Sequence, residues 1–191
     1  ADMIYMFLAE GFEEIEALCP LDLMRRAGLS VTTVGVGGEY ITGAHAITVR
    51  ADITDRDFYA HSAQNDTKMI FLPGGMPGTK NLDASPLTDR LIEEVLENGG
   101  RLAAICAAPM ILGKRGLLNG KCATCYPGFE EELSGATVIS TYAVTDGNIT
   151  TATGAGAAIP FADELVTLLC GESAKEELLR AIRYTDVLPQ K

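Results

Sequence analysis

The stretch RLAAICAAPMILG, residues 101–113, decides the fold, because its pattern changes at a single cysteine. Residues 102–105 form a short apolar run, which is typical of a parallel strand buried on both faces. The residues after Cys106 are small or apolar and include Pro109, so they favour the start of a helix. A strand, a sharp turn and a helix in direct succession predict one unit of an α/β fold, with Cys106 on the turn.

The rest of the chain repeats this alternation of short apolar runs and amphipathic stretches of helical length. We expect Gly28 and Gly171 to end helices, Pro20 to kink the first helix, and Ser85 to cap the helix that Pro86 begins. Glycines and alternation in residues 37–60 suggest a small antiparallel excursion. The pattern predicts a mostly parallel central sheet covered on both faces. Its strands are expected at 3–9, 29–36, from 68 and at 101–105, and its helices at 13–28, 85–100, 158–171 and 173–184.

Composition predicts a single globular domain over residues 1–191. Hydrophobic residues make up 47% of the chain and charged residues 21%, and no linker or repeat divides it. The net charge of −11 repels phosphate backbones and anionic lipid surfaces, which argues against nucleic-acid and membrane partners. With no basic leader and no long apolar span in the sequence, we expect a cytoplasmic protein.

The five cysteines are predicted to be free thiols, because their number is odd and a domain of this size needs no disulfide staples. Cys122 and Cys125 form a nominal C-x-x-C pair. The surrounding residues, KCATCY, read as a strand, in which positions three apart point to opposite faces. We therefore predict no metal site. The glycine-rich stretches match neither a dinucleotide fingerprint nor a phosphate loop, so no cofactor is expected either.

Chemistry is expected at the carboxyl ends of the strands, where α/β sheets bind their ligands. Small neighbours, Ala104, Ala107 and Ala108, leave room for a strained turn that exposes the Cys106 thiol. The helix amino terminus behind it is expected to lower the thiol pKa. The alternative is a buried structural cysteine, a common role for this residue.

Two further strand ends carry residues that can act with this thiol. Gly74 and Gly75 follow the strand from residue 68, and their backbone N–H groups can approach a developing oxyanion. Glu13, Glu14 and Glu16 open the first helix, where carboxylates are ordinarily favoured by the helix dipole. Glu16 can point toward the crevice, but the sequence leaves open which of the three carboxylates meets the thiol.

The motifs LAEGFEEIEALCPLDLMRRAG, LPGGMPGTKNL, AAICAAP and ATCYPGFEEEL, in this order, resemble the ThiJ/PfpI superfamily, in the branch of the parkinsonism-associated deglycase. The resemblance implies a flavodoxin-like three-layer α/β/α sandwich, a homodimer, and Cys106 on a nucleophile elbow with Glu16 beside its sulfur. It also nominates Gly74, Gly75 and Ala107 as oxyanion donors. An ionised carboxylate beside a thiolate raises one of the two pKa values, so we expect Glu16 to be protonated and to donate to the sulfur.

The sequence also departs from this family. Ala107 stands where the protease-like branch has a histidine after the cysteine, and only His45 and His61 occur in the chain, so peptidase activity is disfavoured. Tyr126 precedes Pro127 where the deglycase branch often has a histidine, and a phenol is a poor base near neutral pH. In the loop expected to line the site, Thr153 stands where an arginine is often seen, next to Gly154.

Three functions remain open. The first is a glyoxalase-like or deglycase-like enzyme in which Cys106 attacks a small carbonyl substrate and Glu16 moves the proton. The second is a non-catalytic oxidation sensor or chaperone-like dimer, in which an oxidant converts Cys106 to a sulfinate. The third is a hydrolase or amidase whose base, His45 or His61, comes across a dimer interface. Bacterial relatives carry a thiazole-biosynthesis name, which no feature of the sequence supports.

Overall fold

A computed structural model describes residues 2–185 and has a seven-stranded sheet at its centre. All neighbouring strands in this sheet run parallel except β10 and β11, which form an antiparallel pair at one edge. The expected parallel α/β sheet is confirmed. Its strands, in spatial order, are β10 (Ala143–Asp146), β11 (Ile149–Ala152), β7 (Arg101–Ile105), β6 (Asp66–Leu72), β1 (Asp2–Leu8), β2 (Val31–Gly35) and β5 (Ile53–Thr54).

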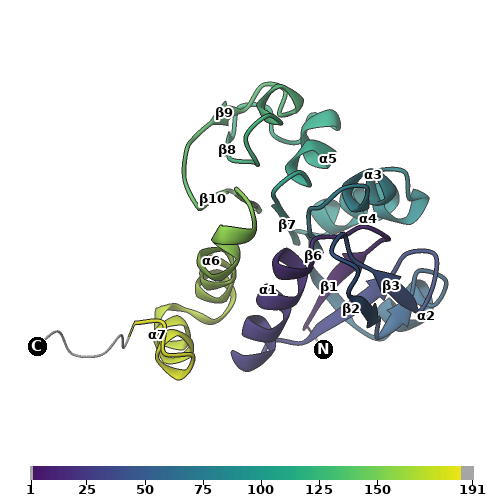
Figure 1. The fold of residues 1–191 in the computed structure, drawn as a ribbon, viewed down its shortest axis with the longest axis horizontal. Coiled ribbons are helices and arrows are strands. Elements are labelled where there is room, and N and C mark those ends of the chain that lie inside the picture. Colours follow the sequence, from purple (N-terminus) through teal and green to yellow (C-terminus); the bar gives the residue numbers. More distant parts are fainter. Residues whose placement is uncertain (1, 186–191) are drawn as a thin grey trace, which may run out of the picture.

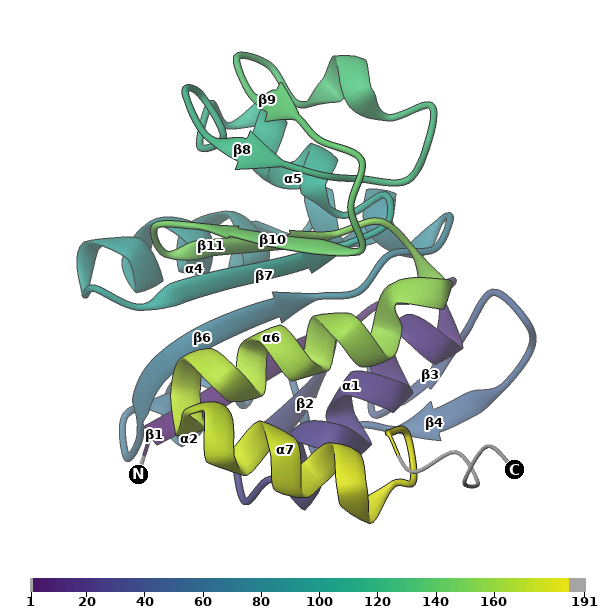
Figure 2. The same cartoon turned by 90° about the vertical axis from the view of Figure 1, so that its left-hand side faces the viewer.

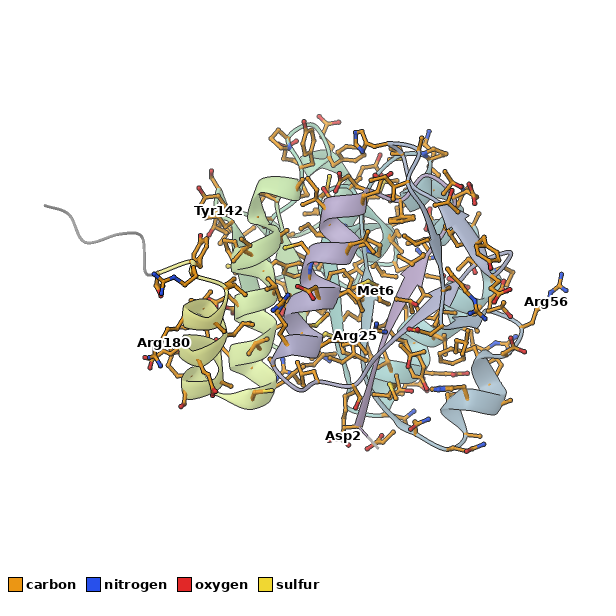
Figure 3. All side chains as sticks on the ribbon, turned by 60° about the horizontal axis from the view of Figure 1, so that its bottom comes forward. Asp2, Met6, Arg25, Arg56, Tyr142 and Arg180 are labelled. Atoms are coloured by element: carbon orange, nitrogen blue, oxygen red, sulfur yellow. The ribbon has the colours of Figure 1, made fainter. Side chains whose placement is uncertain are left out.

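The alternation of side chains along β1 divides the core into two halves. Tyr5 and Phe7 belong to one buried cluster, whereas Ile4, Met6 and Leu8 belong to the other. Figure 3 shows Met6 inside the molecule, while charged side chains such as those of Arg56 and Arg180 project outward. Burial on both faces is the reason that the central strands read as continuous apolar runs.

Helices cover both faces, which gives the three layers expected from the sequence (Figures 1 and 2). On one face lie α1 (Glu14–Arg26), α6 (Ala158–Cys170) and α7 (Glu172–Ala181). The other face is covered by α2 (Phe58–Ser62), α3 (Gly78–Asp83), α4 (Pro86–Glu97) and α5 (Pro109–Lys114). Within residues 2–185, no helix combines the length and the apolar character that a membrane span requires.

Local signals account for where the helices begin and end. The side chain of Ser85 accepts a hydrogen bond from the Thr88 N–H, which caps α4 at Pro86 as predicted. Gly28 and Gly171 adopt positive φ values of 83° and 89° just beyond α1 and α6, a conformation that glycine reaches without strain. Helix α1 continues through Pro20.

Smaller elements lie outside the main sheet. β3 (Tyr40–Thr42) and β4 (Thr48–Arg50) form an antiparallel hairpin, which confirms the expected excursion. β8 (Cys122–Ala123) pairs with β9 (Thr137–Val138), so the strand expected over KCATCY is only two residues long. Cys122 is nevertheless exposed and Cys125 buried, and both are free thiols. Short 3₁₀ turns occur at Glu130–Glu132 and Ala155–Ala157.

Candidate active site

Three adjacent central strands, β7, β6 and β1, deliver their loops to the same edge of the sheet. Backbone hydrogen bonds tie two of these loops together: the Glu13 N–H donates to the Gly74 carbonyl at 2.9 Å, and the Gly78 N–H donates to the Gly11 carbonyl at 3.1 Å. The loop after Leu8 is thus fixed against the loop after Leu72. This places the start of α1 beside the end of β7, as the carboxyl-end rule predicts.

Cys106 occupies a strained turn directly after β7. Its φ of +67° lies in the left-handed region that residues other than glycine rarely adopt. Both of its backbone polar groups are held, since its N–H donates to the Ala152 carbonyl at 2.9 Å and its carbonyl accepts from the Tyr126 N–H at 2.9 Å. The predicted elbow is therefore present, and its thiol is half-buried.

The sulfur of Cys106 meets backbone donors from two loops. The N–H groups of Ala107 and Gly75 both hydrogen-bond the thiol and favour its thiolate form. The helix that follows, α5, is only six residues long and begins at Pro109, three residues beyond the thiol. Individual N–H groups of the elbow and of the glycine loop therefore replace the long helix dipole that the sequence suggested.

Glu16 is the carboxylate that meets the thiol. Its residue surface is 1% exposed, and its side chain is hydrogen-bonded to Cys106. Glu13 instead caps α1 by accepting from the Glu16 N–H at 2.8 Å. Glu14 turns away and accepts from the N–H groups of His45 and Ile47. The sequence left open which of the three carboxylates meets the thiol. The three side chains leave the first turn of α1 in different directions, and that of Glu16 points toward Cys106.

Gly74 differs from its predicted role as an oxyanion donor. Its N–H donates to Oε2 of Glu16 at 3.0 Å, so this group orients the carboxylate and does not face an oxyanion. A Cβ at Gly74 would lie 2.4 Å from that oxygen and 2.6 Å from Cβ of Cys106, which leaves no room for a side chain. The neighbouring Gly75, at φ +91°, keeps its predicted orientation toward the thiol.

Glu16 has a further backbone hydrogen-bond donor that was not predicted from the sequence. The backbone N–H of Ala155 also hydrogen-bonds the carboxylate. Ala155 lies in the 3₁₀ turn after β11, far from Glu16 in sequence. A backbone group on an alanine leaves no mark in a single sequence, and only the glycines beside it indicated a tight turn.

Burial dominates the electrostatics of the pair. It raises the pKa of Glu16 from the ordinary value of 4.5 to about 7, and the charge of Glu13 adds to this effect. Burial also raises the pKa of the Cys106 thiol, and the negative charge of an ionised Glu16 raises it further. The expectation of a thiol pKa lowered by a helix terminus is therefore wrong. Thiolate formation depends on where the proton shared with Glu16 resides.

Of the predicted lining residues, Tyr126 is bonded to the backbone of Cys106, and Gly154 and Thr153 contact Tyr126 and Cys125. Tyr126 is joined to Cys106 through its backbone N–H, and its ring lies against Gly154, where an added Cβ would be 3.3 Å from Cδ2 of the ring. Thr153 donates from its hydroxyl to the Cys125 carbonyl at 3.0 Å, so this side chain is engaged in holding the loop. Pro127 is exposed.

Both histidines are engaged elsewhere. His61 hydrogen-bonds the Tyr5 hydroxyl at 2.9 Å, and His45 lies 2.9 Å from Glu14 and 3.6 Å from Glu13. In the part of the chain that the structure describes, no hydrogen bond joins either ring to Cys106. The cluster of Glu13, Glu14 and His45 has ligand atoms within 4.8 Å of one another. Helix capping and hairpin hydrogen bonds account for it, and we assign no metal there.

A shared proton predicts a two-step pH profile for alkylation of Cys106. Below about pH 7 both groups hold their protons, above it one proton is lost from the pair, and the thiolate is complete only after the second loss. Glu16→Gln removes the charge that raises the thiol pKa, so we expect a single step at lower pH than the second wild-type step. Iodoacetamide rates, followed by mass spectrometry of each cysteine peptide, measure this.

The exposed Cys122 is the internal control for that experiment, because it lies in β8, outside the main sheet, and its profile is expected to be the same in both proteins. A Cys106 profile that Glu16→Gln leaves unchanged would contradict the shared proton.

Comparison with known proteins agrees with this geometry. Residues 2–168 match the model of the DJ-1/PfpI family. Protein dj-1beta of Drosophila melanogaster is 33% identical over 180 residues, which cover 93% of this chain and 94% of that protein. The glutathione-independent glyoxalase DJR-1.2 of Caenorhabditis elegans is 28% identical over 176 residues, 91% of each chain. The solved structure of oxidized Toxoplasma gondii DJ-1 has a TM-score of 0.89 at 27% identity and covers 97% of this chain and 100% of its own. The chain therefore belongs to the DJ-1/PfpI family.

Proposed function

We propose that this protein converts small 2-oxoaldehydes to 2-hydroxy acids without a cofactor, with Cys106 as nucleophile and Glu16 as proton carrier. The observation that carries the proposal is the buried Glu16 carboxyl, hydrogen-bonded to a strained thiol and with a pKa raised to about 7. A group that titrates near neutral pH is suited to both donate and accept a proton. The relative named as a glutathione-independent glyoxalase supports the same class of reaction.

The chemistry balances with water as the only co-reactant. The Cys106 sulfur forms a bond to the aldehyde carbon, and the carbonyl electron pair moves to oxygen, which takes a proton to give a hemithioacetal. Glu16 then accepts the proton from that carbon and returns one to the neighbouring carbonyl carbon through an enediol, which leaves a thioester on Cys106. Water cleaves the thioester, and the acid and the free thiol are released. The aldehyde carbon is oxidised as its neighbour is reduced.

Two backbone N–H groups are expected to stabilise the oxyanion of this adduct. The N–H groups of Gly75 and Ala107 already bond the sulfur, and the oxygen of the adduct is only two bonds away from that sulfur, so these groups can donate to it. Such preorganised donors stabilise charge as it develops. Gly74 has a supporting role, because it fixes the Glu16 oxygen at 3.0 Å.

A second candidate function is oxidation sensing at the same thiol. Cys106 is half-buried and has two backbone donors and one carboxyl beside it. The same groups can hold the oxygens of a sulfinate, which favours one defined oxidation state. Cys125, by contrast, is only 5% exposed, which restricts the access of an oxidant to its sulfur.

We also infer that two copies associate through the outer side of α1, in the cytoplasm, where free thiols persist. Ile15 and Ile47 are 54% and 51% exposed, although both are large apolar residues. Together with Leu18 and Cys19 they line a shallow apolar depression between α1 and the β3–β4 hairpin. Adjacent exposed apolar side chains of this kind mark interaction surfaces.

Turnover of methylglyoxal tests the enzymatic proposal. We expect 2-hydroxy acid to accumulate with the wild-type protein, and Cys106→Ser and Glu16→Gln each to lower kcat/KM by at least about a hundredfold, since each removes a nucleophile or proton carrier. Cys122→Ser, which changes an exposed thiol, serves as the control and keeps full activity. Absence of product across a panel of small 2-oxoaldehydes would refute the proposal.

Peroxide titration tests the sensor. Two equivalents of peroxide are expected to add two oxygen atoms to Cys106 while the other four cysteines stay reduced, because Cys106 has a carboxyl and two N–H donors at its sulfur. Peptide mass spectrometry locates the oxygens. Equal oxidation of all five cysteines would count against sensing.

Light scattering after size-exclusion chromatography tests the dimer. Ile15→Asp is expected to convert a wild-type dimer to a monomer, because it places a charge on the apolar surface. Val138→Asp is the matched control, since Val138 is also exposed, at 38%, but lies in β9. A monomeric wild-type protein at tens of micromolar would show the inference to be wrong.

A further inference from the structure

The Tyr126 ring is a large, half-exposed aromatic surface next to the reactive thiol. Its residue is 51% exposed, which is unusual for a tyrosine fixed at both its backbone and its ring. The backbone N–H of Tyr126 donates to the Cys106 carbonyl, so the residue cannot move away from the elbow without breaking that bond.

The loop on the other side of the site fixes the ring. Gly154 lies against Cδ2 and Cε2 of Tyr126, at 3.3 Å and 3.8 Å from the place a Cβ would occupy. The next residue, Ala155, donates its N–H to Glu16. The ring therefore contacts the loop whose Ala155 N–H holds Glu16, while the backbone of Tyr126 is bonded to the elbow that carries Cys106.

The charges that act most strongly on Cys106 and Glu16 are negative. Glu13 acts on Glu16, and Glu16 acts on Cys106. Thr153, on the loop beside Gly154, bonds the Cys125 carbonyl and is uncharged. His45 is held by Glu14 and Glu13. An anionic substrate meets repulsion at this site and finds no cation in these contacts.

We propose that Tyr126 is a specificity-determining residue and that the site selects uncharged 2-oxoaldehydes with a flat aromatic substituent over anionic 2-oxoaldehydes. The inference rests on the proposed function and adds the substrate class to it. Once the aldehyde carbon is bonded to the Cys106 sulfur, its substituent is expected to lie against the exposed ring of Tyr126. An aromatic substituent stacks on the phenol ring, whereas a methyl group covers little of it.

The test compares kcat/KM for three probes: phenylglyoxal, methylglyoxal and 4-carboxyphenylglyoxal, an anionic 2-oxoaldehyde. We expect the wild-type protein to favour phenylglyoxal over methylglyoxal and over 4-carboxyphenylglyoxal. Tyr126→Ala is expected to lower the phenylglyoxal to methylglyoxal ratio about five- to tenfold, the effect of losing one aromatic stacking contact. Tyr126→Phe is expected to keep the ratio, because it keeps the ring.

A second pair of variants moves the ring without removing it. Gly154 has an extended backbone, with φ 168°, so Gly154→Ala adds a methyl group against the ring without backbone strain. We expect it to lower the same ratio. Gly156→Ala, where a Cβ meets open space, is the matched control and keeps the ratio. Tyr184→Ala removes a tyrosine of similar exposure, 48%, from the end of the chain that the structure describes, and is expected to change nothing.

The outcomes distinguish a wrong proposed function from a wrong specificity inference. If the wild-type protein turns over none of the probes, the proposed function is wrong. If it turns over methylglyoxal, but Tyr126→Ala and Gly154→Ala leave the ratio unchanged, the specificity inference is wrong and the function stands. Tyr126→Arg gives an independent check, because a cation at this position is expected to raise kcat/KM for 4-carboxyphenylglyoxal relative to phenylglyoxal at least threefold. An unchanged ratio between these two probes in that variant would overturn the electrostatic part of the inference.

Discussion

The hydrogen bond between the buried carboxyl of Glu16 and the thiol of Cys106 is the interaction on which the rest of the site depends. Two acidic groups in contact, both shielded from water, cannot both ionise easily, so one proton is held between them near neutral pH. Every other feature of the site either orients one of the two groups or lets them approach. Glu16 therefore links the thiol's reactivity to the proton transfers that carbonyl chemistry needs.

The fold maintains this contact against a free-energy cost. Raising the pKa of Glu16 from 4.5 to about 7 corresponds to a loss of folding stability on the order of 3 kcal/mol, because each pKa unit is about 1.4 kcal/mol. The folded state binds this proton more tightly than the unfolded state, so the contribution of Glu16 to stability is complete below pH 4.5 and is lost as the pH rises through 7. The strained φ of Cys106 adds a further cost. The two apolar cores that pack on either side of the parallel sheet offset both of these free-energy costs.

Sequence reasoning reached the fold and the pair, but not the finer contacts. Apolar runs, the Ser85 cap and the glycines at 28 and 171 predict the elements, because each signal is local. Cys106 and Glu16 follow from strand ends and from family resemblance. The N–H of Gly74 turned out to serve Glu16, and the missed donor Ala155 comes from a distant turn. Such contacts depend on where individual backbone N–H groups point in the folded chain, and the identity of a residue does not predict this direction.

The most direct test of the account is the pH titration of the Glu16 side-chain carboxyl by carbon-13 NMR, in wild-type protein and in Cys106→Ala. We expect a wild-type carboxyl that titrates near pH 7 with a second, weaker inflection as the thiol loses its proton. In Cys106→Ala the second inflection disappears, while burial keeps the remaining midpoint above 4.5. A single midpoint near 4.5, the same in both proteins, would contradict the shared proton and with it the proposed catalytic role of Glu16.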